Sequence, residues 1–200
     1  MKVRHPLQEI SLLPRHRRPF VAVVDEALPG EVCDALVARI ERERPAPAPI
    51  VGPSGEVMNA RVRNNERVMF DDAALAADLF ARTREMIPET LHEGMLIGYN
   101  ERFRGYRYKS GQRFAPHFDG AFVRDENQRS QITVLFYLNE GFSGGETILN
   151  DYETIITPRR GMALLFQHAI LHEGATVTAG CKYVLRTDAM YRFTASRTRP

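Results

Sequence analysis

Tryptophan is absent from this 200-residue chain, and cysteine and lysine are scarce, with two and three copies. Two cysteines cannot build a disulfide scaffold, and because Cys33 and Cys181 lie far apart in a chain without secretory features, we expect free thiols. No apolar run is long enough for a membrane span, and residues 1–19 lack the apolar core of a signal peptide. We therefore expect a cytoplasmic protein that does not contact a membrane.

Neither positive nor negative charge predominates in the chain. The formal net charge is only +2, with 27 basic and 25 acidic residues. It is unevenly spread, since residues 1–20 carry +4 and residues 192–200 carry +3, which leaves −5 on residues 21–191. Basic ends on an acidic body favour solvated tails over a nucleic-acid-binding surface, so nucleic acid is not an expected partner. We predict a basic N-terminal leader over 1–19 and a single domain over 20–195.

The apolar content is ordinary for a globular domain. Hydrophobic residues make up 44% of the chain, which excludes disorder and allows one sizeable core. Residues 20–24 form an apolar run suited to a buried strand. Apolar residues at three- and four-residue spacing predict helices over 31–44 and 73–86, the second of them capped by Asp71 or Asp72.

From residue 95 onward the apolar period changes to two. Short β-rich runs separated by glycine, asparagine and proline predict strands at 95–99, 103–108, 131–138, 146–149, 153–156, 161–167 and 182–193. No helix separates these runs, as a parallel sheet would need, so the pattern favours a sandwich, jelly roll or barrel. The expected fold is α+β and mainly β, with N-terminal helices that buttress the sheet.

The candidate metal ligands lie in this β-rich half of the chain. His117 and Asp119 lie two residues apart on a strand pattern, so their side chains point to the same side. A third ligand is needed, and from spacing alone His168 and His172 are equal candidates. Two imidazoles and one carboxylate suit non-haem Fe(II), whereas a structural zinc site would want four ligands, usually including cysteine.

Three further stretches carry a resemblance to a known family. Residues 108–119 (YKSGQRFAPHFD), 132–139 (ITVLFYLN) and 144–147 (GGET) resemble the prolyl 4-hydroxylase branch of the Fe(II)/2-oxoglutarate-dependent dioxygenases. The final stretch has the same order and spacing as that family, through Pro158, Gly161, Phe166, His172, Gly180 and Lys182. The resemblance covers about residues 20–193.

The resemblance implies a double-stranded β-helix, or jelly roll, that uses Fe(II), 2-oxoglutarate and O₂, with ascorbate as a further cofactor. Carried over position by position, it implies that His117, Asp119 and His172 bind the iron, and it thereby selects His172 over His168. An intact carboxylate at Asp119 favours hydroxylation, because the halogenating relatives leave that coordination position to chloride.

The resemblance also implies a binding site for 2-oxoglutarate. Lys182 matches the basic residue that holds the distal carboxylate, and a buried carboxylate does need such a cation. Arg186 points to the same face of its strand and is the competing cation. Tyr108, Tyr137 and, more weakly matched, Thr147 fall at positions whose hydroxyls contact the cosubstrate.

The implied activity is hydroxylation of an unactivated C–H bond, with release of succinate and CO₂. The expected substrate is a prolyl residue or another amino acid, in a peptide, a protein or free form. One alternative is an oxidative demethylase acting on nucleic acid, which the acidic body and the lack of tryptophan disfavour. Another is a non-catalytic jelly-roll binding module, which would be expected to have lost a ligand or the lysine. The polar segment 59–70 is a candidate substrate mouth and 124–130 a candidate lid.

Overall fold

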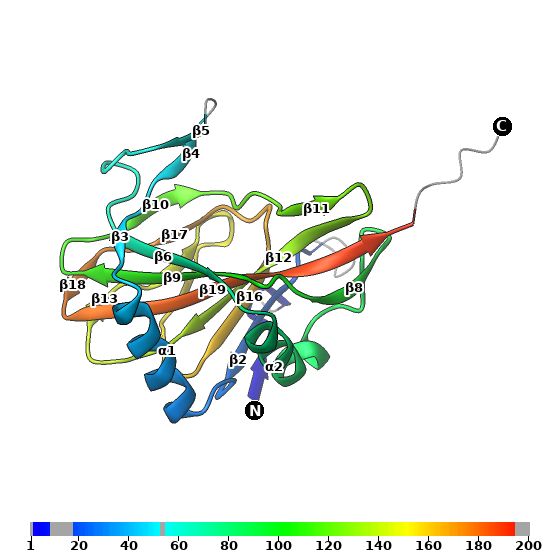
Figure 1. Cartoon of the computed structure of the whole chain (residues 1–200), viewed down its shortest axis with the longest axis horizontal. Helices are drawn as coiled ribbons and strands as arrows, with labels where there is room; N and C mark the ends of the chain where they lie inside the picture. Colours follow the sequence, from blue (N-terminus) through cyan, green and yellow to red (C-terminus); the bar gives the residue numbers. More distant parts are fainter. Residues whose placement is uncertain (1, 9–17, 53–54, 195–200) are drawn as a thin grey trace.

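The computed structural model describes residues 2–8, 18–52 and 55–194, and antiparallel β-sheets dominate it (Figure 1). The larger sheet has eleven strands. Its main path runs in the spatial order β1 (Lys2–Arg4), β2 (Val21–Asp25), β16 (Ala163–Gln167), β12 (Gln128–Tyr137), β19 (Cys181–Phe193), β9 (Arg102–Lys109), β6 (Glu66–Asp71) and β3 (Ala46–Pro47). Three strands lie off this path: β8 (Gly94–Tyr99) beside β19, β7 (Thr90–Leu91) beside β8, and β11 (Val123–Asp125) beside β12.

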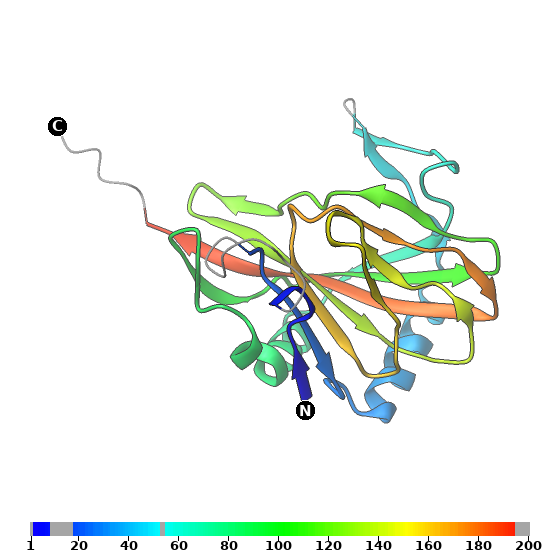
Figure 2. The ribbon, with the colours of Figure 1, turned by 180° about the vertical axis from the view of Figure 1, so that it is seen from behind.

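A four-stranded sheet lies against the larger one, as Figure 2 shows from behind. Its order is β10 (Phe114–His117), β17 (His172–Gly174), β14 (Thr147–Leu149) and β15 (Thr154–Ile156). Two small pairs complete the β-structure: β4 (Ile50–Gly52) with β5 (Gly55–Val57), and β13 (Ser143–Gly144) with β18 (Val177–Ala179). The two facing sheets form a jelly roll, so the predicted fold class is confirmed.

Two apolar clusters hold these layers together. One lies between the sheets and joins Tyr137 and Leu164 of the larger sheet to Leu149 and Ile156 of the smaller. The other lies on the opposite face of the larger sheet, under the two α-helices. Because alternate residues of a strand point to opposite faces, each central strand contributes to both clusters. The helices therefore support the sheet from the side away from the candidate site.

The first helix, α1 (Gly30–Arg42), confirms the helix predicted over 31–44. Its buried residues Cys33, Leu36 and Ile40 form one stripe that packs on the sheet. The helix approaches β9 at Gly105, where a Cβ would lie 2.6 Å from Cγ1 of Ile40. Glycine is needed here because the isoleucine fills the space that any side chain would occupy.

The second helix, α2 (Ala73–Thr83), begins at the predicted cap. The Asp72 carboxylate accepts a 2.9 Å hydrogen bond from the backbone N–H of Leu75, so Asp72 is the N-cap. The helix is shorter than the predicted 73–86, since its last turn tightens into the 3₁₀-helix η3 (Arg84–Met86). Tightening of the last turn is common where the final carbonyl groups lack intrahelical partners.

The predicted basic leader, 1–19, joins the fold in part. Its first described stretch, residues 2–8, contains β1, which pairs with β2, and the 3₁₀-helix η1 (Pro6–Gln8). Leu7 is buried in the cluster between the sheets, which explains why this segment packs instead of extending into solvent. Residues 9–17 of the leader and 195–200 of the basic C-terminus lie outside the described residues.

The polar segment 59–70 contains a strand that its composition conceals. Strand β6 begins at Glu66 and alternates burial, with Val68 in the core and Arg67 and Met69 on the opposite face. The polar residues of one face obscure the apolar alternation in the sequence, yet one apolar face is enough for a strand beside β9. Arg67 and Met69 therefore point to the side of the sheet that carries the candidate site.

Cys33 and Cys181 are both free, as predicted. Cys33 is buried beneath α1, and Cys181 is half-buried at the start of β19. Among the described residues, we find no helix that combines the length and the apolarity needed to cross a membrane.

Candidate active site

Two histidines face one another across a pair of strands of the smaller sheet. His117 ends β10, His172 begins β17, and the two residues are register partners. The Nδ1 atoms lie 2.9 Å from the carbonyl oxygens of Ala115 and Ile170, respectively. In each ring Nδ1–H donates to the carbonyl, so both Nε2 lone pairs point into the space between the rings.

Asp119 completes this cluster two residues after His117. Its carboxylate oxygens lie 3.8 Å from Nε2 of His117 and 3.5 Å from Nε2 of His172. One oxygen accepts a 2.6 Å hydrogen bond from Arg186, and the other accepts one of 2.6 Å from Thr133. Burial by itself would raise the pKa of Asp119, but the positive charge of Arg186 and the hydrogen bond from Thr133 hold it well below its usual range.

Burial keeps both imidazoles neutral. It lowers the pKa of His117 to about 4 and lowers that of His172 as well. The ligand atoms of His117, Asp119 and His172 lie within 4.8 Å of one another. Two lone pairs and a carboxylate that converge on one buried point repel each other unless a cation lies between them. This donor set of two imidazoles and one carboxylate on one side is the one that suits non-haem Fe(II).

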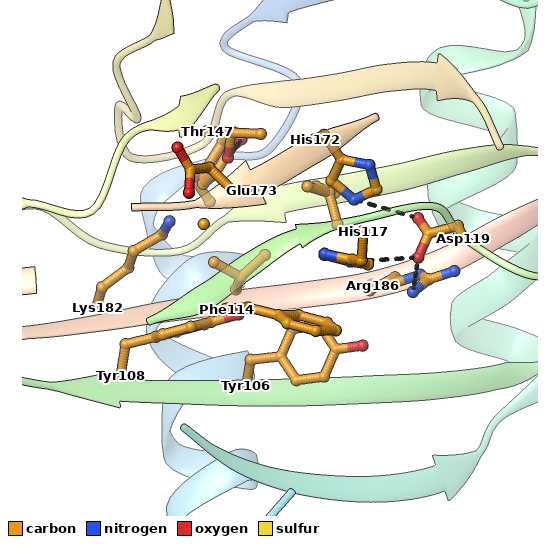
Figure 3. Close-up of a pocket in the computed structure, with 14 residues that line it drawn as sticks. Tyr106, Tyr108, Phe114, His117, Asp119, Thr147, His172, Glu173, Lys182 and Arg186 are labelled. Carbon is orange, nitrogen blue, oxygen red and sulfur yellow. Dashed lines mark hydrogen bonds and ion pairs between the residues drawn. The ribbon is translucent and has the colours of Figure 1, made fainter. Parts of the chain in front are cut away.

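Lys182 lies at the opposite end of the same cavity from Arg186, as Figure 3 shows. It is 3% exposed and donates a 2.5 Å hydrogen bond to the carbonyl of Gly145. Its ammonium group lies 5.3 and 5.4 Å from the ring centres of Tyr108 and Tyr137. Burial lowers the pKa of Lys182 from 10.5 to about 7. An ammonium group has three donors, so this buried lysine is suited to hold a carboxylate.

A family model described as the 2OG-Fe(II) oxygenase superfamily matches residues 103–187. A PKHD-type hydroxylase of Parvibaculum lavamentivorans is 30% identical over 137 residues, which are 64% of this chain and 58% of the relative. The chain thus resembles the 2OG-Fe(II) oxygenase superfamily over its β-rich half. Probable prolyl 4-hydroxylase 11 of Arabidopsis thaliana is 38% identical over 73 residues, which are 33% of this chain and 24% of the relative. The chain thus spans less than two thirds of these relatives.

Solved structures of other proteins have a similar fold. The viral collagen prolyl hydroxylase of Paramecium Bursaria Chlorella virus-1, solved as a 2OG complex, has a TM-score of 0.64 at 21% identity, over 87% of this chain and 96% of the other. The Pseudomonas putida prolyl-4-hydroxylase has a TM-score of 0.63 at 21% identity, over 88% and 93%. At this identity the likeness establishes the jelly roll alone.

Seven of the residues singled out from the sequence line this one cavity. They are His117, Asp119, His172, Lys182, Tyr108, Tyr137 and Thr147. The hydroxyls of Tyr137 and Thr147 lie 2.7 Å apart and share a hydrogen bond. Arg186, the competing cation, lies at the Asp119 end and forms ion pairs with Asp119 and Asp188.

His168, the other candidate ligand, lies outside the cluster. Its Nδ1 is 2.9 Å from the Thr133 hydroxyl and its Nε2 is 2.8 Å from the Ser130 hydroxyl. Both ring nitrogens are therefore occupied, and none is left for a metal.

Sequence reasoning missed Thr133 and the role of His168 beside Asp119. Strand parity could have identified Thr133, because it lies on the same face of β12 as Tyr137. No sequence pattern indicated that His168 lies behind Thr133, since that contact joins β12 to the turn after β16, 35 residues along the chain.

Of the candidate substrate mouth and the candidate lid, only the mouth contributes residues to a cavity beside the candidate site. From the segment 59–70, Val62, Arg63 and Arg67 line an outer cavity that also contains His117 and Asp119. The segment 124–130 comprises the end of β11, the turn and the start of β12, and none of its residues lines the inner or the outer cavity. Phe118, 60% exposed, also lines the outer cavity.

Proposed function

We propose that this chain is an Fe(II)- and 2-oxoglutarate-dependent dioxygenase that hydroxylates an unactivated C–H bond of a prolyl residue or another amino acid, in a peptide or free. One observation carries the proposal. The buried cavity places three metal-ligating side chains, His117, Asp119 and His172, at one end and an under-coordinated buried ammonium group, Lys182, at the other. Neither a zinc site nor a simple core would need both.

Fe(II) would be held by His117, Asp119 and His172, and three ligands leave room for a chelating cosubstrate and O₂. The donors fit the metal because both imidazoles are neutral and turned by their Nδ1 hydrogen bonds, and because the carboxylate stays ionised. When bound, the iron and 2-oxoglutarate supply the oxidising chemistry, with succinate and CO₂ as co-products.

The chain's own residues would bind and orient the ligands and exclude water from the cavity. Lys182 would hold the distal carboxylate of 2-oxoglutarate, and Tyr108 would line that subsite. Tyr137 and Thr147, joined by their hydrogen bond, would present hydroxyls to the same ligand. Thr133 and Arg186 restrain the carboxylate of Asp119 from both sides, so that it does not rotate when the metal binds.

The relatives support the amino-acid substrate. Several matched proteins are named as prolyl hydroxylases, and one solved relative, from Trichoplax adhaerens, is in complex with a peptide fragment of a hypoxia inducible factor. Ascorbate as a cofactor and a cytoplasmic location remain part of the proposal. The two free thiols support a reducing compartment. A demethylase of nucleic acid is not favoured, and a binding module would have no use for the retained ligands and lysine.

The proposal is tested by incubating the protein with Fe(II), 2-oxoglutarate, ascorbate and a panel of proline-containing peptides and free amino acids. We expect succinate and a product heavier by one oxygen atom, both dependent on Fe(II). Succinate formation should be lost in His117→Ala and kept in His92→Ala, which removes an exposed histidine. A metal that proves to be zinc with four protein ligands, or no Fe(II)-dependent succinate, would overturn the proposal.

A further inference from the structure

Four arginines line the outer cavity that leads to the candidate iron site. They are Arg63, Arg67, Arg104 and Arg186, and Asp119 is the single carboxylate residue among the described residues around this cavity. The outer and inner cavities share His117, Asp119 and Arg186, among others, so a substrate bound over the metal would pass these guanidinium groups. The arginines lie at the end of the site away from Lys182, which Figure 3 shows for Arg186.

Strand alternation and register gather three of these arginines. Arg104 of β9 is paired with Arg186 of β19, and Tyr106 of β9 is paired with Arg67 of β6. Residues paired across neighbouring strands point to the same face, and so do residues two apart on one strand. The side chains of these three arginines and of Tyr106 therefore project from one face of the larger sheet. Arg63, three residues before β6, adds its guanidinium group to them.

Arg63 is the member of this group without a carboxylate partner among the described residues. Arg67 pairs with Glu56 at 3.0 Å, while Arg104 and Arg186 share Asp188 at 3.1 and 3.2 Å. These pairs reduce the charge of three of the four arginines.

Arg63 itself is 5% exposed. Its Nε donates a 2.7 Å hydrogen bond to the amide oxygen of Asn65, and its buried Nη2 has no acceptor among the described residues. A buried guanidinium group is costly unless it is paired, so this one requires an anion.

Unsatisfied polar atoms cluster at the same place. Within the described chain, Arg63 Nη2, Tyr106 OH and Arg186 Nε are buried without a hydrogen-bond partner, and all three residues line the outer cavity. Burial by itself would raise the pKa of Tyr106, but Arg186, Arg63 and Arg104 lower it below its usual value. Three neighbouring donors in a positive field describe a subsite for an anion.

Ring contacts place this subsite close to the metal ligands. The guanidinium carbon of Arg63 lies 4.7 Å from the ring centre of Tyr106 and 4.4 Å from that of Phe114. Phe114 in turn stacks on His117 with ring centres 3.5 Å apart. The distance from the guanidinium carbon of Arg63 to the centre of the His117 ring therefore cannot exceed the sum of the last two distances. An extended chain covers about 3.3–3.6 Å per residue, so an anion on Arg63 belongs to the reacting residue or to one about two residues away.

We infer that the substrate of this oxygenase carries a carboxylate on or next to the residue that is hydroxylated, and that Arg63, with Tyr106 and Arg186, binds it. This inference rests on the proposed function and specifies its substrate. The carboxylate has two possible sources, the free α-carboxylate of an amino acid or of a C-terminal residue, and the side chain of an adjacent Asp or Glu.

The test uses probes that differ only in charge. Calorimetry is carried out on protein loaded with Mn(II) and saturated with 2-oxoglutarate, so that the Lys182 end is filled. One pair of probes is N-acetyl-L-proline and N-acetyl-L-prolinamide. The other is a capped peptide with Pro-Asp and its Pro-Asn counterpart, which separates the two sources. We expect the acid of at least one pair to bind at least about tenfold more tightly than its amide, since a charge-assisted hydrogen bond contributes that much.

Arg63→Gln should abolish this preference, and Arg63→Lys should restore part of it. Arg82→Gln, which changes a partly exposed arginine of α2, should leave the preference unchanged. If Arg63→Gln does not fold, the acid–amide comparison in the unchanged protein still decides. Equal binding of acid and amide in both pairs, or no binding of either acid, overturns the inference. Succinate formation without a carboxylate preference leaves the proposed function standing, whereas a carboxylate preference without Fe(II)-dependent succinate contradicts only that function.

Discussion

The hydroxyl of Thr133 donates a 2.6 Å hydrogen bond to the carboxylate of Asp119. Because its single proton is used there, its contact at 2.9 Å with His168 must be accepted from Nδ1–H of that ring. Nε2 of His168 then accepts from the Ser130 hydroxyl, whose oxygen accepts the backbone N–H of Phe122. Burial lowers the pKa of His168, so its ring stays neutral in this role. These hydrogen bonds form one continuous series in which each donor meets an acceptor. The series ends at Asp119, the candidate iron ligand.

Replacing Thr133 by valine should weaken metal binding without unfolding the protein. Valine has nearly the same shape, but it leaves Asp119 restrained only by Arg186 and leaves His168 Nδ1–H without its acceptor. Loss of such an outer hydrogen bond typically costs about 10–100-fold in metal affinity. The Fe(II) concentration that gives half-maximal succinate formation should rise by that factor. Thr90→Val, at an exposed position of β7, should not change it, and equal Fe(II) dependence in all three proteins would contradict the prediction.

The parts of the fold that could be predicted from the sequence are those with a regular apolar period. Strand β12 and helix α1 each bury a repeating set of side chains, and the spacing of those residues is visible without tertiary information. Strand β6 was less visible, because Arg67 and Met69 lie on the face opposite to its buried Val68 and interrupt the apolar pattern. The leader strand β1 has only three residues and depends on pairing with β2.

The residues of the candidate site also differ in how far the sequence could predict them. Lys182 could be singled out because lysine is rare here and because the family resemblance assigns it a role. The position of Arg63 could not be predicted, since it depends on stacking between Tyr106 and Phe114 from other segments. Short local motifs identify ligands, whereas residues that restrain those ligands or meet the substrate are assembled by strand register.

Replacing Lys182 by methionine should weaken 2-oxoglutarate binding more than it slows turnover at saturation. Methionine fills similar space but removes the charge that would hold the distal carboxylate. A charge-assisted hydrogen bond contributes about 1.5–3 kcal/mol, so the KM for 2-oxoglutarate should rise about 10–100-fold. Lys182→Arg should recover part of the loss. Lys109→Met, at an exposed lysine of β9 that pairs with Glu66, is the matched control, and an equal effect of both methionine variants would contradict the role of Lys182.

Binding of 2-oxoglutarate should be coupled to protonation of Lys182. Burial lowers the pKa of this lysine to about 7 in the protein without ligand, whereas a bound carboxylate would raise it. Above about pH 7 the lysine must therefore gain a proton on binding, and the affinity should fall by up to about tenfold per pH unit. Calorimetry in buffers of different ionisation enthalpy should show nearly one proton taken up at about pH 8.5 and almost none at about pH 6. Undiminished uptake in Lys182→Met would assign the proton to another group.

Replacing Gly105 by alanine should destabilise the fold from the side of the sheet opposite to the candidate site. The new methyl group would lie 2.6 Å from Cγ1 of Ile40 and 2.9 Å from Cγ2 of Val68, both of them buried. Overpacking of this kind costs about 1–3 kcal/mol, which denaturant unfolding would measure as a lower midpoint. Combining it with Ile40→Ala should cost less than the sum of the two single changes, because the smaller residue makes room for the methyl group. Gly120→Ala, where a Cβ meets no atom within 4 Å, should change stability little, and a midpoint for Gly105→Ala equal to that of this control would show that α1 can move away from β9.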